Sequence, residues 1–144
     1  MQVSDILRSK GADVVTVDPT MTVGDLVALL AQRRIGAVVV SPDGETLAGI
    51  VSERDVVSEL AEHGPDVLAR TVGEICTSEV VTAGTDDRLE DLAVTMTQGR
   101  FRHLPVVVDG RLHGIVSIGD VVKARLSELE EERQALTNYI TGQA

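Results

Sequence analysis

Aromatic residues are almost absent from this chain of 144 residues, which has no tryptophan and only Phe101 and Tyr139 as aromatic side chains. Proteins that hold single-stranded nucleic acid stack bases on several aromatic side chains, and this chain has no such set. Positive charge is also scarce, because 23 acidic residues outnumber 13 basic ones and leave a net charge of -10. That charge repels a phosphate backbone. We therefore expect no nucleic-acid partner.

Cysteine and long apolar runs are scarce as well. Cys76 is the single cysteine, which excludes an internal disulfide and a CxxC redox or zinc site and fits a reducing compartment. Apolar stretches such as AVVV at residues 37–40 are far shorter than the roughly 20 residues that cross a bilayer. The first fifteen residues contain no long apolar segment typical of a signal peptide. We expect no membrane partner and a cytoplasmic location.

The chain does contain an internal repeat. GIVSERDVV at residues 49–57 returns as GIVSIGDVV at residues 114–122. Three earlier segments match in the same order: VSDIL with VGEIC, DVVTVDPTMTVGDL with EVVTAGTDDRLEDL, and GAVVV with HLPVVV. The spacing stays between 65 residues, from Gly49 to Gly114, and 69 residues, from Val3 to Val72. Such a period predicts two copies of one structural unit.

Each copy has the same pattern of elements. Short strands are predicted at residues 14–17 and 80–82, each followed by a helix with apolar residues three, four and seven apart. A hairpin follows, with turns at residues 42–44 and at Asp109 and Gly110. A second helix then begins near Ser52 or Ser117. The predicted order is β-α-β-β-α, twice, in a mixed α/β (α+β) fold whose core is filled by the 43% hydrophobic residues, mostly Val, Leu, Ile and Ala.

The repeats divide the chain into four parts. Residues 1–63 form repeat 1, residues 64–71 a linker in which Gly64 and Pro65 end the preceding helix, and residues 72–126 repeat 2. Residues 127–144 form a C-terminal helical extension. Its helix carries apolar residues in steps of four and three, with Arg133 in one apolar place; the others are Leu126, Leu129, Leu136 and Ile140. This face predicts either a partner helix or a helix folded back on its own domain.

Two Ser-x-x-Asp motifs, Ser52 to Asp55 and Ser117 to Asp120, are the first candidate functional residues. A serine followed by an acidic residue three positions later is a common helix cap. The same helix N-terminus attracts phosphate or ribose, with the aspartate accepting hydrogen bonds from sugar hydroxyls. Sequence repetition does not separate the two interpretations. Arg54 belongs to the first motif, where the second has Gly119.

The run Arg100 to His103 is the second candidate. It precedes a predicted strand, so its side chains are expected at the strand entrance, where arginine suits phosphate oxygens. The alternative is a solvated basic turn in an acidic protein. His63, His103 and His113 lack the spacing of metal ligands, and no nucleophile, dinucleotide or Walker motif is present. We expect neither an enzyme nor a metal site.

The doubled GIVSERD and GIVSIGD motifs, with RFRHLPVVVDGRLHGIVS, resemble a tandem pair of CBS (cystathionine beta-synthase) domains, or Bateman module, of the small stand-alone type. The resemblance implies two repeats packed sheet to sheet around a pseudo-two-fold axis, with two clefts between them. It also implies ligands such as AMP, ADP, ATP or NAD(H), and sometimes S-adenosylmethionine, with no required cofactor.

Carried over residue by residue, the resemblance gives roles to this chain's own positions. Asp55 and Asp120 hold ribose hydroxyls, Ser52 and Ser117 lie near ribose or phosphate, and Thr16 and Thr82 line the adenine. Arg102 and His103 reach across to the phosphates bound at Asp55. Because the sequence alignment sets Gly36 opposite His103, the Asp120 cleft lacks a matched clamp. We expect unequal clefts, with the better site at Asp55.

Two functions follow from these observations. The first is a non-catalytic regulatory sensor, a homodimer that binds an adenine nucleotide and signals its occupancy to a protein target through the packing of repeats or subunits. The alternative is a structural or interaction module that binds no nucleotide and acts through its last helix.

Overall fold

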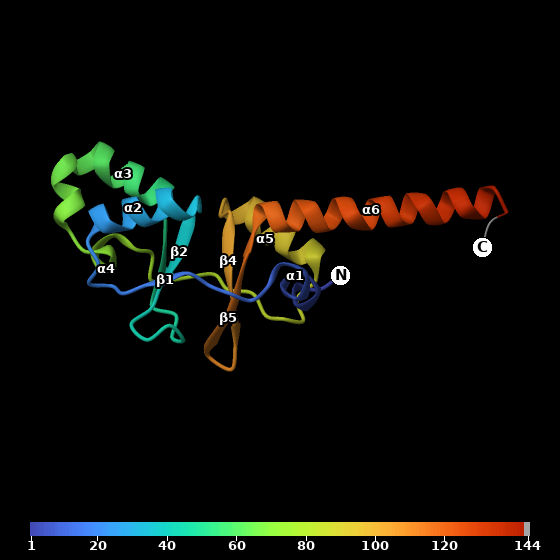
Figure 1. Ribbon diagram of the computed structural model, residues 1–144, viewed down its shortest axis with the longest axis horizontal. Coiled ribbons are helices and arrows are strands. Elements are labelled where there is room, and N and C mark those ends of the chain that lie inside the picture. The colour runs from blue at the N-terminus through green and yellow to red at the C-terminus, as the bar shows by residue number, and fades with distance from the viewer. Residues whose placement is uncertain (143–144) are drawn as a thin grey trace.

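The computed structural model describes residues 1–142. Two halves stand side by side with their sheets facing each other, and helices cover the outer faces (Figure 1). The elements follow in the order α1 (Val3–Lys10), β1 (Thr16–Val17), α2 (Val23–Arg33), β2 (Ala37–Val40), β3 (Gly49–Ser52), α3 (Glu53–His63), the 3-10 helix η1 (Pro65–Ala69), α4 (Val72–Ile75), α5 (Leu89–Gly99), β4 (His103–Val108), β5 (Arg111–Ser117) and α6 (Ile118–Ile140). The mixed fold of two facing repeats and a long last helix is therefore confirmed.

Matching hairpins form the centre of each half. β2 pairs antiparallel with β3 and sets Ala37 beside Ser52, while β4 pairs antiparallel with β5 and sets His103 beside Ser117. Since Ser52 and Ser117 are equivalent, Ala37 is the structural counterpart of His103, and Gly36 that of Arg102. The alignment of Gly36 with His103 was wrong by one residue. The sequence has no turn or gap at this point that would reveal the register.

The strand predicted at residues 80–82 is absent from the described chain. Thr77 exchanges two backbone hydrogen bonds with Ile50 of β3, at 2.9 and 3.0 Å, whereas Ala83 bonds to the other sheet through Pro105 and Val107. The segment between Thr77 and Ala83 crosses from one sheet to the other and pairs with neither. In the first half the predicted strand shortens to Thr16–Val17, parallel to β2.

The first helix of each repeat packs into the other half. Val3, Ile6 and Leu7 of α1 are buried in the core formed with α5, β4, β5 and α6. Conversely, Val72 and Ile75 of α4 are buried in the core of α2, β2, β3 and α3. α1 contacts β5 and α6, and α4 contacts β3 and α3 on the other side of the molecule (Figure 1). Segments 11–15 and 77–82 are therefore the two crossings between the halves.

The segment between the repeats is folded onto the first half. Gly64 is the C-cap of α3, with φ of 79°, so the predicted helix end is confirmed. The chain then forms η1, whose Val67 is buried in the first core. The division at residues 63 and 72 describes the sequence repeats and stays a prediction.

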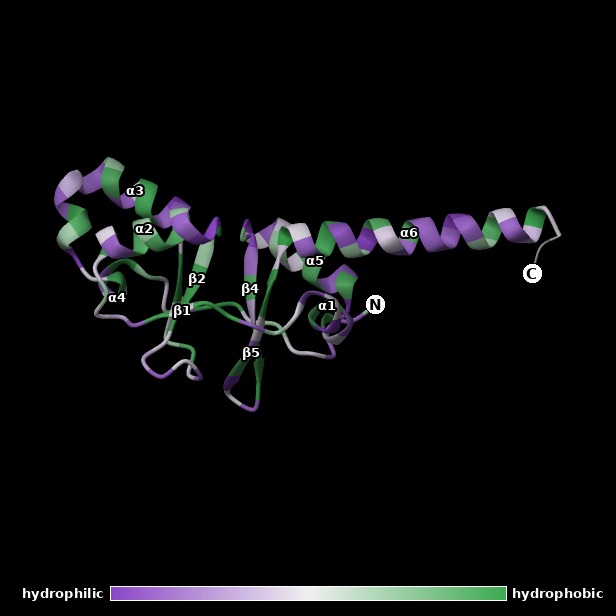
Figure 2. Cartoon of the chain, in the orientation of Figure 1, coloured by the Kyte–Doolittle hydropathy of each residue, from purple (hydrophilic) through white to green (hydrophobic). Residues whose placement is uncertain are grey.

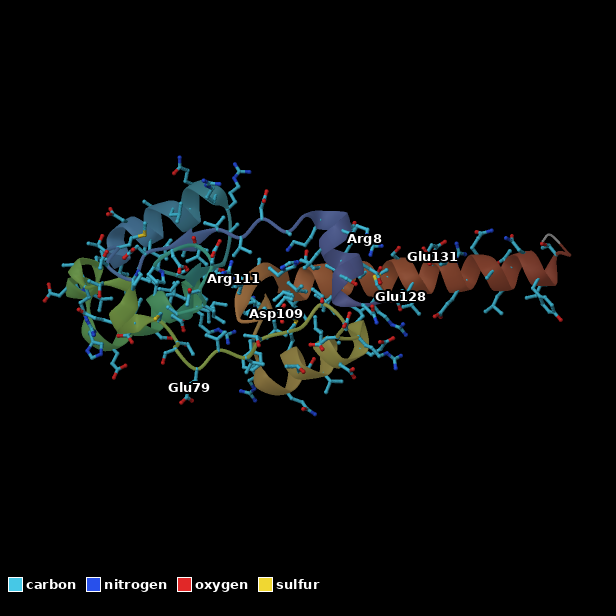
Figure 3. The ribbon with its side chains drawn as sticks, turned by 90° about the horizontal axis from the view of Figure 1, so that it is seen from below. Arg8, Glu79, Asp109, Arg111, Glu128 and Glu131 are labelled. Carbon is cyan, nitrogen blue, oxygen red and sulfur yellow. The ribbon has the colours of Figure 1, made fainter. Side chains whose placement is uncertain are left out.

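The last helix runs through residue 126 without a break, so the predicted extension continues the second helix of repeat 2. α6 runs 23 residues, and beyond Glu131 it stands clear of the body (Figure 3). The alternative in which it folds back on its own domain is therefore wrong. Hydrophobic bands recur along its outer part (Figure 2), and Leu126, Leu136 and Ile140 are 62%, 64% and 80% exposed. Within residues 1–142 no helix is long and apolar enough to span a membrane.

Candidate functional site

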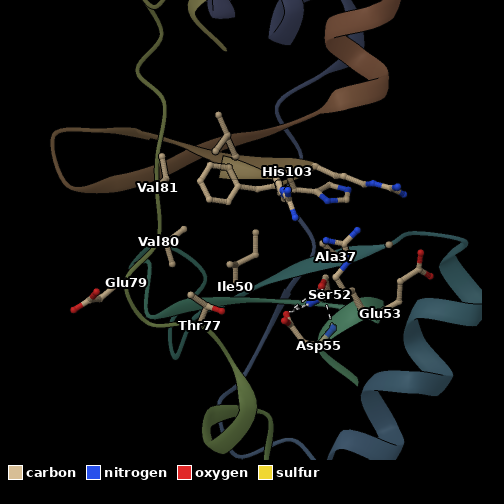
Figure 4. Close-up of a pocket in the computed structure, with 16 residues that line it drawn as sticks. Ala37, Ile50, Ser52, Glu53, Asp55, Thr77, Glu79, Val80, Val81 and His103 are labelled. Atoms are coloured by element: carbon tan, nitrogen blue, oxygen red, sulfur yellow. Dashed lines mark hydrogen bonds between the residues drawn. The ribbon is translucent and has the colours of Figure 1, made fainter. Parts of the chain in front are cut away.

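The first cleft lies between the halves, at the N-terminus of α3, and has a volume of about 320 Å³. Figure 4 shows Val80 and Val81 along one side, Ser52 and Asp55 along the other, and His103 entering from the opposite sheet. Ile50 adds to the apolar side. The volume is at the lower end of the roughly 300 to 1,000 Å³ of small-molecule sites. One apolar side and one polar side suit a ligand with a flat base and a polar tail.

Ser52 and Asp55 form a capping box at the start of α3. The Ser52 amide donates to Asp55 Oδ2 at 2.8 Å, and the Asp55 amide donates to Ser52 Oγ at 3.3 Å. The Ser52 hydroxyl also donates to Asp55 Oδ2, at 3.1 Å. The capping interpretation is therefore confirmed. Among the described residues Asp55 Oδ1 has no hydrogen-bond partner, so this oxygen is available to a ligand as well.

Cationic side chains gather at the same cleft from two elements. Arg54 comes from the first turn of α3, while Arg100 and Arg102 come from the turn between α5 and β4. Arg100 ends α5 in the left-handed conformation, with φ of 58°, and turns the chain toward the strand. Arg34 does the same after α2, with φ of 54°. The three cleft arginines and the N-terminus of α3 favour an anionic group.

His103 is partly buried between the halves, whereas Arg100 and Arg102 of the same run are exposed, and it lines both clefts. Burial lowers the pKa of its imidazole below 6.5. Asp120 and Glu53 oppose this shift, while Lys10 and Arg102 add to it. Burial therefore favours the neutral imidazole, whereas a nearby phosphate would favour the protonated form.

The second cleft, of about 370 Å³, lies between the halves, where the crossing segment 13–15 and the two hairpins meet, and Lys10 and Ser117 are part of its lining. Ser117 and Asp120 repeat the capping box: the Ser117 amide donates to Asp120 Oδ2 at 2.8 Å, and the Asp120 amide donates to Ser117 Oγ at 3.1 Å. Here a cation is already present, because Lys10 Nζ lies 2.6 Å from Asp120 Oδ2. Burial acts to raise the pKa of Asp120, but the hydrogen bonds from Lys10 and Ser117 outweigh it and the pKa is lowered.

The predicted site residues divide into three groups. Five of them meet at the first cleft: Ser52, Arg54, Asp55, Arg102 and His103. Ser117 lines the second cleft, and Asp120 lies beside it on Lys10.

Thr16 and Thr82 are not among the residues that line either cleft, and their contact with adenine stays a prediction. Thr16 is held in β1 opposite Val39, and Thr82 is exposed on the crossing segment. Val80 and Val81, just before Thr82, line the first cleft, and Val14 and Val15, just before Thr16, line the second. The lining residues that the sequence reasoning missed include these valines, Ile50, Thr77 and Lys10. The repeat of DVV as EVV was the available signal for the valines.

A family model for the CBS domain matches residues 3–62 and 72–127. This chain belongs to the CBS-domain family. The CBS-domain protein CBSX3 of Arabidopsis thaliana, named as mitochondrial, is 38% identical over 150 residues, which cover 97% of this chain and 72% of that one. YhcV of Bacillus subtilis is 32% identical over 135 residues, 94% of each chain. A CBS-domain protein of Agrobacterium tumefaciens superposes with a TM-score of 0.83 at 45% identity, covering 86% of this chain and 92% of that one.

Two similar CBS pairs were crystallised with adenosine compounds. CBSX2 in complex with AMP has a TM-score of 0.73 and 32% identity, covering 88% of this CBS pair and 96% of its own chain. The CBS pair of the protein MJ0100, in complex with 5′-methylthioadenosine and S-adenosyl-L-methionine, has a TM-score of 0.77 and 25% identity, covering 89% and 98%. Adenosine-containing ligands therefore bind to relatives of this fold.

Proposed function

We propose that this CBS pair is a non-catalytic regulatory module that binds an adenine nucleotide in the Asp55 cleft. The observation that carries the proposal is the gathering of Asp55, Arg54, Arg102 and His103 beside the apolar side chains of the crossing segment. A carboxylate accepts hydrogen bonds from ribose hydroxyls, and guanidinium groups bind phosphate oxygens. The AMP complex of CBSX2 supports the same ligand class.

AMP, ADP, ATP and NAD(H) are the candidate ligands within this class. In our proposal the base lies against Val80, Val81 and Ile50, the ribose on Asp55, and the phosphates toward the arginines. All four ligands share the adenosine part and differ in the length of the phosphate tail. The open arginine side of the cleft accepts tails of different length, so their order of affinity is an experimental question.

Isothermal titration calorimetry with AMP, ATP and NADH tests the proposal directly. We expect at least one of these compounds to bind and to raise the melting temperature of the protein by mass action. Adenosine, which has no phosphate, is the matched control and is expected to bind more weakly than AMP. Absence of both heat and a thermal shift with all three nucleotides would refute nucleotide sensing.

We further propose that the protein is a homodimer that passes ligand occupancy to a protein target, and that it works in the cytoplasm. The supporting feature is the exposed apolar face of α6, which includes Leu126, Leu129 and Leu136. Sedimentation is expected to show a dimer at micromolar concentration. Leu136→Glu should shift it toward monomer, while Gln134→Glu, on the same exposed helix but off this face, should not. A monomeric wild-type chain would refute the dimer.

The same exposed face favours a second candidate function, in which α6 recruits a different protein and the clefts bind no nucleotide. The two candidates differ in one experiment. Removing residues 127–144 should leave AMP binding unchanged if the module is a sensor, because the Asp55 cleft contains no residue of α6. In the second candidate the full chain shows no AMP binding, and the truncation abolishes capture of the partner.

A further inference from the structure

The two clefts differ at one backbone oxygen. In the first half, Ile50 O accepts a hydrogen bond from the Thr77 amide at 2.9 Å. In the second half the equivalent oxygen, Ile115 O, accepts from the side chain of Lys10, also at 2.9 Å. The ammonium group of Lys10 thus stands where the first half has a backbone N–H, and from there it also reaches Asp120.

The difference originates in the length of the lead-in segment. Five residues, 8–12, separate Leu7 from Asp13, whereas two residues, 77–78, separate the equivalent Cys76 and Glu79. The three extra residues lengthen the first helix, since α1 has eight residues and α4 has four. Lys10 is the last residue of this longer helix. The first cleft has no lysine in its lining.

Two close polar contacts hold the ammonium group of Lys10, although this residue lies near the surface. Its ammonium lies 2.6 Å from Asp120 Oδ2 and 2.9 Å from Ile115 O, and its side chain is 32% exposed. An ammonium group has three donors, so two of them are satisfied inside the protein. By contrast, within residues 1–142 the Asp55 carboxylate accepts hydrogen bonds only from the amide and hydroxyl of Ser52.

We infer that Lys10 competes with nucleosides for the Asp120 carboxylate, so that each chain binds one nucleotide, in the Asp55 cleft. The inference rests on the proposed function and adds the number of sites and the residue that sets it. Both aspartates keep an Oδ1 with no hydrogen-bond partner among the described residues, but at Asp120 the Lys10 ammonium neutralises the carboxylate and occupies Oδ2, which a second ribose hydroxyl would need. Binding there requires Lys10 to leave two partners at once.

The test is the number of AMP molecules bound per chain by calorimetry. Wild type is expected to bind one, and Asp55→Asn is expected to weaken that site strongly. Lys10→Gln removes the charge while keeping an amide donor for Ile115 O, and Lys10→Met removes both. Each of these two variants is expected to bind two AMP molecules per chain. Lys123→Met, at the other lysine of the chain, is the control and should bind one.

The second site is then isolated in a double variant. Asp55→Asn with Lys10→Gln is expected to bind one AMP, and adding Asp120→Asn is expected to abolish it. Two AMP molecules bound by wild type, or one bound by both folded Lys10 variants, would overturn the inference. A silent wild type with one site in Lys10→Gln would refute the proposed function at Asp55 and support the role of Lys10. Circular dichroism of every variant identifies loss of binding that is due to unfolding.

Discussion

Replacing Asp55 by asparagine separates the two roles of this residue. Asparagine keeps an oxygen that accepts from the Ser52 amide, now at 2.8 Å, but it removes the negative charge at the start of α3. Losing a charge there costs roughly 0.3–1 kcal/mol of unfolding free energy. A hydrogen bond to a charged acceptor contributes about 1.5–3 kcal/mol. If a ribose hydroxyl depends on this carboxylate, AMP affinity falls about 10- to 150-fold.

Asp25→Asn is the matched control. Asp25 occupies the same third position of a helix, α2, where its amide donates to Thr22 Oγ1 at 3.1 Å, and it lies outside both clefts. Urea unfolding is expected to give small losses for both variants, whereas calorimetry with AMP should separate them. If Asp55→Asn binds AMP as tightly as Asp25→Asn does, Asp55 is a helix cap only, and the ribose assignment is refuted.

Three further perturbations test the cleft and its walls. Burial lowers the pKa of His103 in the folded protein, so below about pH 6.5 the unfolded state binds more protons than the folded state does. The unfolding free energy should therefore fall as the pH is lowered from about 6.5. The midpoints of urea unfolding should show this fall, and His103→Gln should make them depend less on pH. Arg102→Met should weaken the binding of AMP about 10- to 150-fold in calorimetry and leave the binding of adenosine unchanged. Arg111→Met, at an exposed arginine, is the control and should change neither affinity. Equal losses of affinity for both ligands would contradict a role of Arg102 in phosphate binding. A Cβ added at Gly49 would lie 2.8 Å from Cys76 Sγ and from Thr77 O, so Gly49→Ala should lower the unfolding free energy by roughly 1–3 kcal/mol. Gly119→Ala, whose Cβ would have its nearest contact at 3.6 Å, is the control and should leave the unfolding free energy unchanged. Equal stability of the two variants would argue against the close approach at Gly49.

Local features of the fold were predictable from the sequence. The Ser-x-x-Asp boxes were recognised because their partners are three residues apart, and both caps form as expected. The end of α3 at Gly64 and the hairpin turn at Asp109 and Gly110 follow from the backbone conformations that these residues adopt easily. In each case the deciding interaction lies within a few residues along the chain.

Features that depend on contacts between the halves were not predictable in the same way. The partners Lys10 and Asp120 are 110 residues apart, and nothing near either residue indicates the other. Residues 80–82 have the composition of a strand, but the crossing from one sheet to the other leaves them without a strand to pair with. Thr82 is not among the lining residues of either cleft for the same reason, since the crossing decides which of its side chains face the cavity.

The exchange of α1 and α4 between the halves means that one repeat of the sequence is not one unit of folding. A chain carrying a single repeat would have a first helix with no core to enter and a core with no first helix. Two such chains could each place the first helix in the core of the other chain, as domain-swapped dimers do. The present arrangement therefore corresponds to a swapped dimer whose two subunits have been joined end to end. A circular permutant that opens the chain at a crossing segment, rather than between the repeats, would make each first helix continuous in sequence with the half whose core it enters.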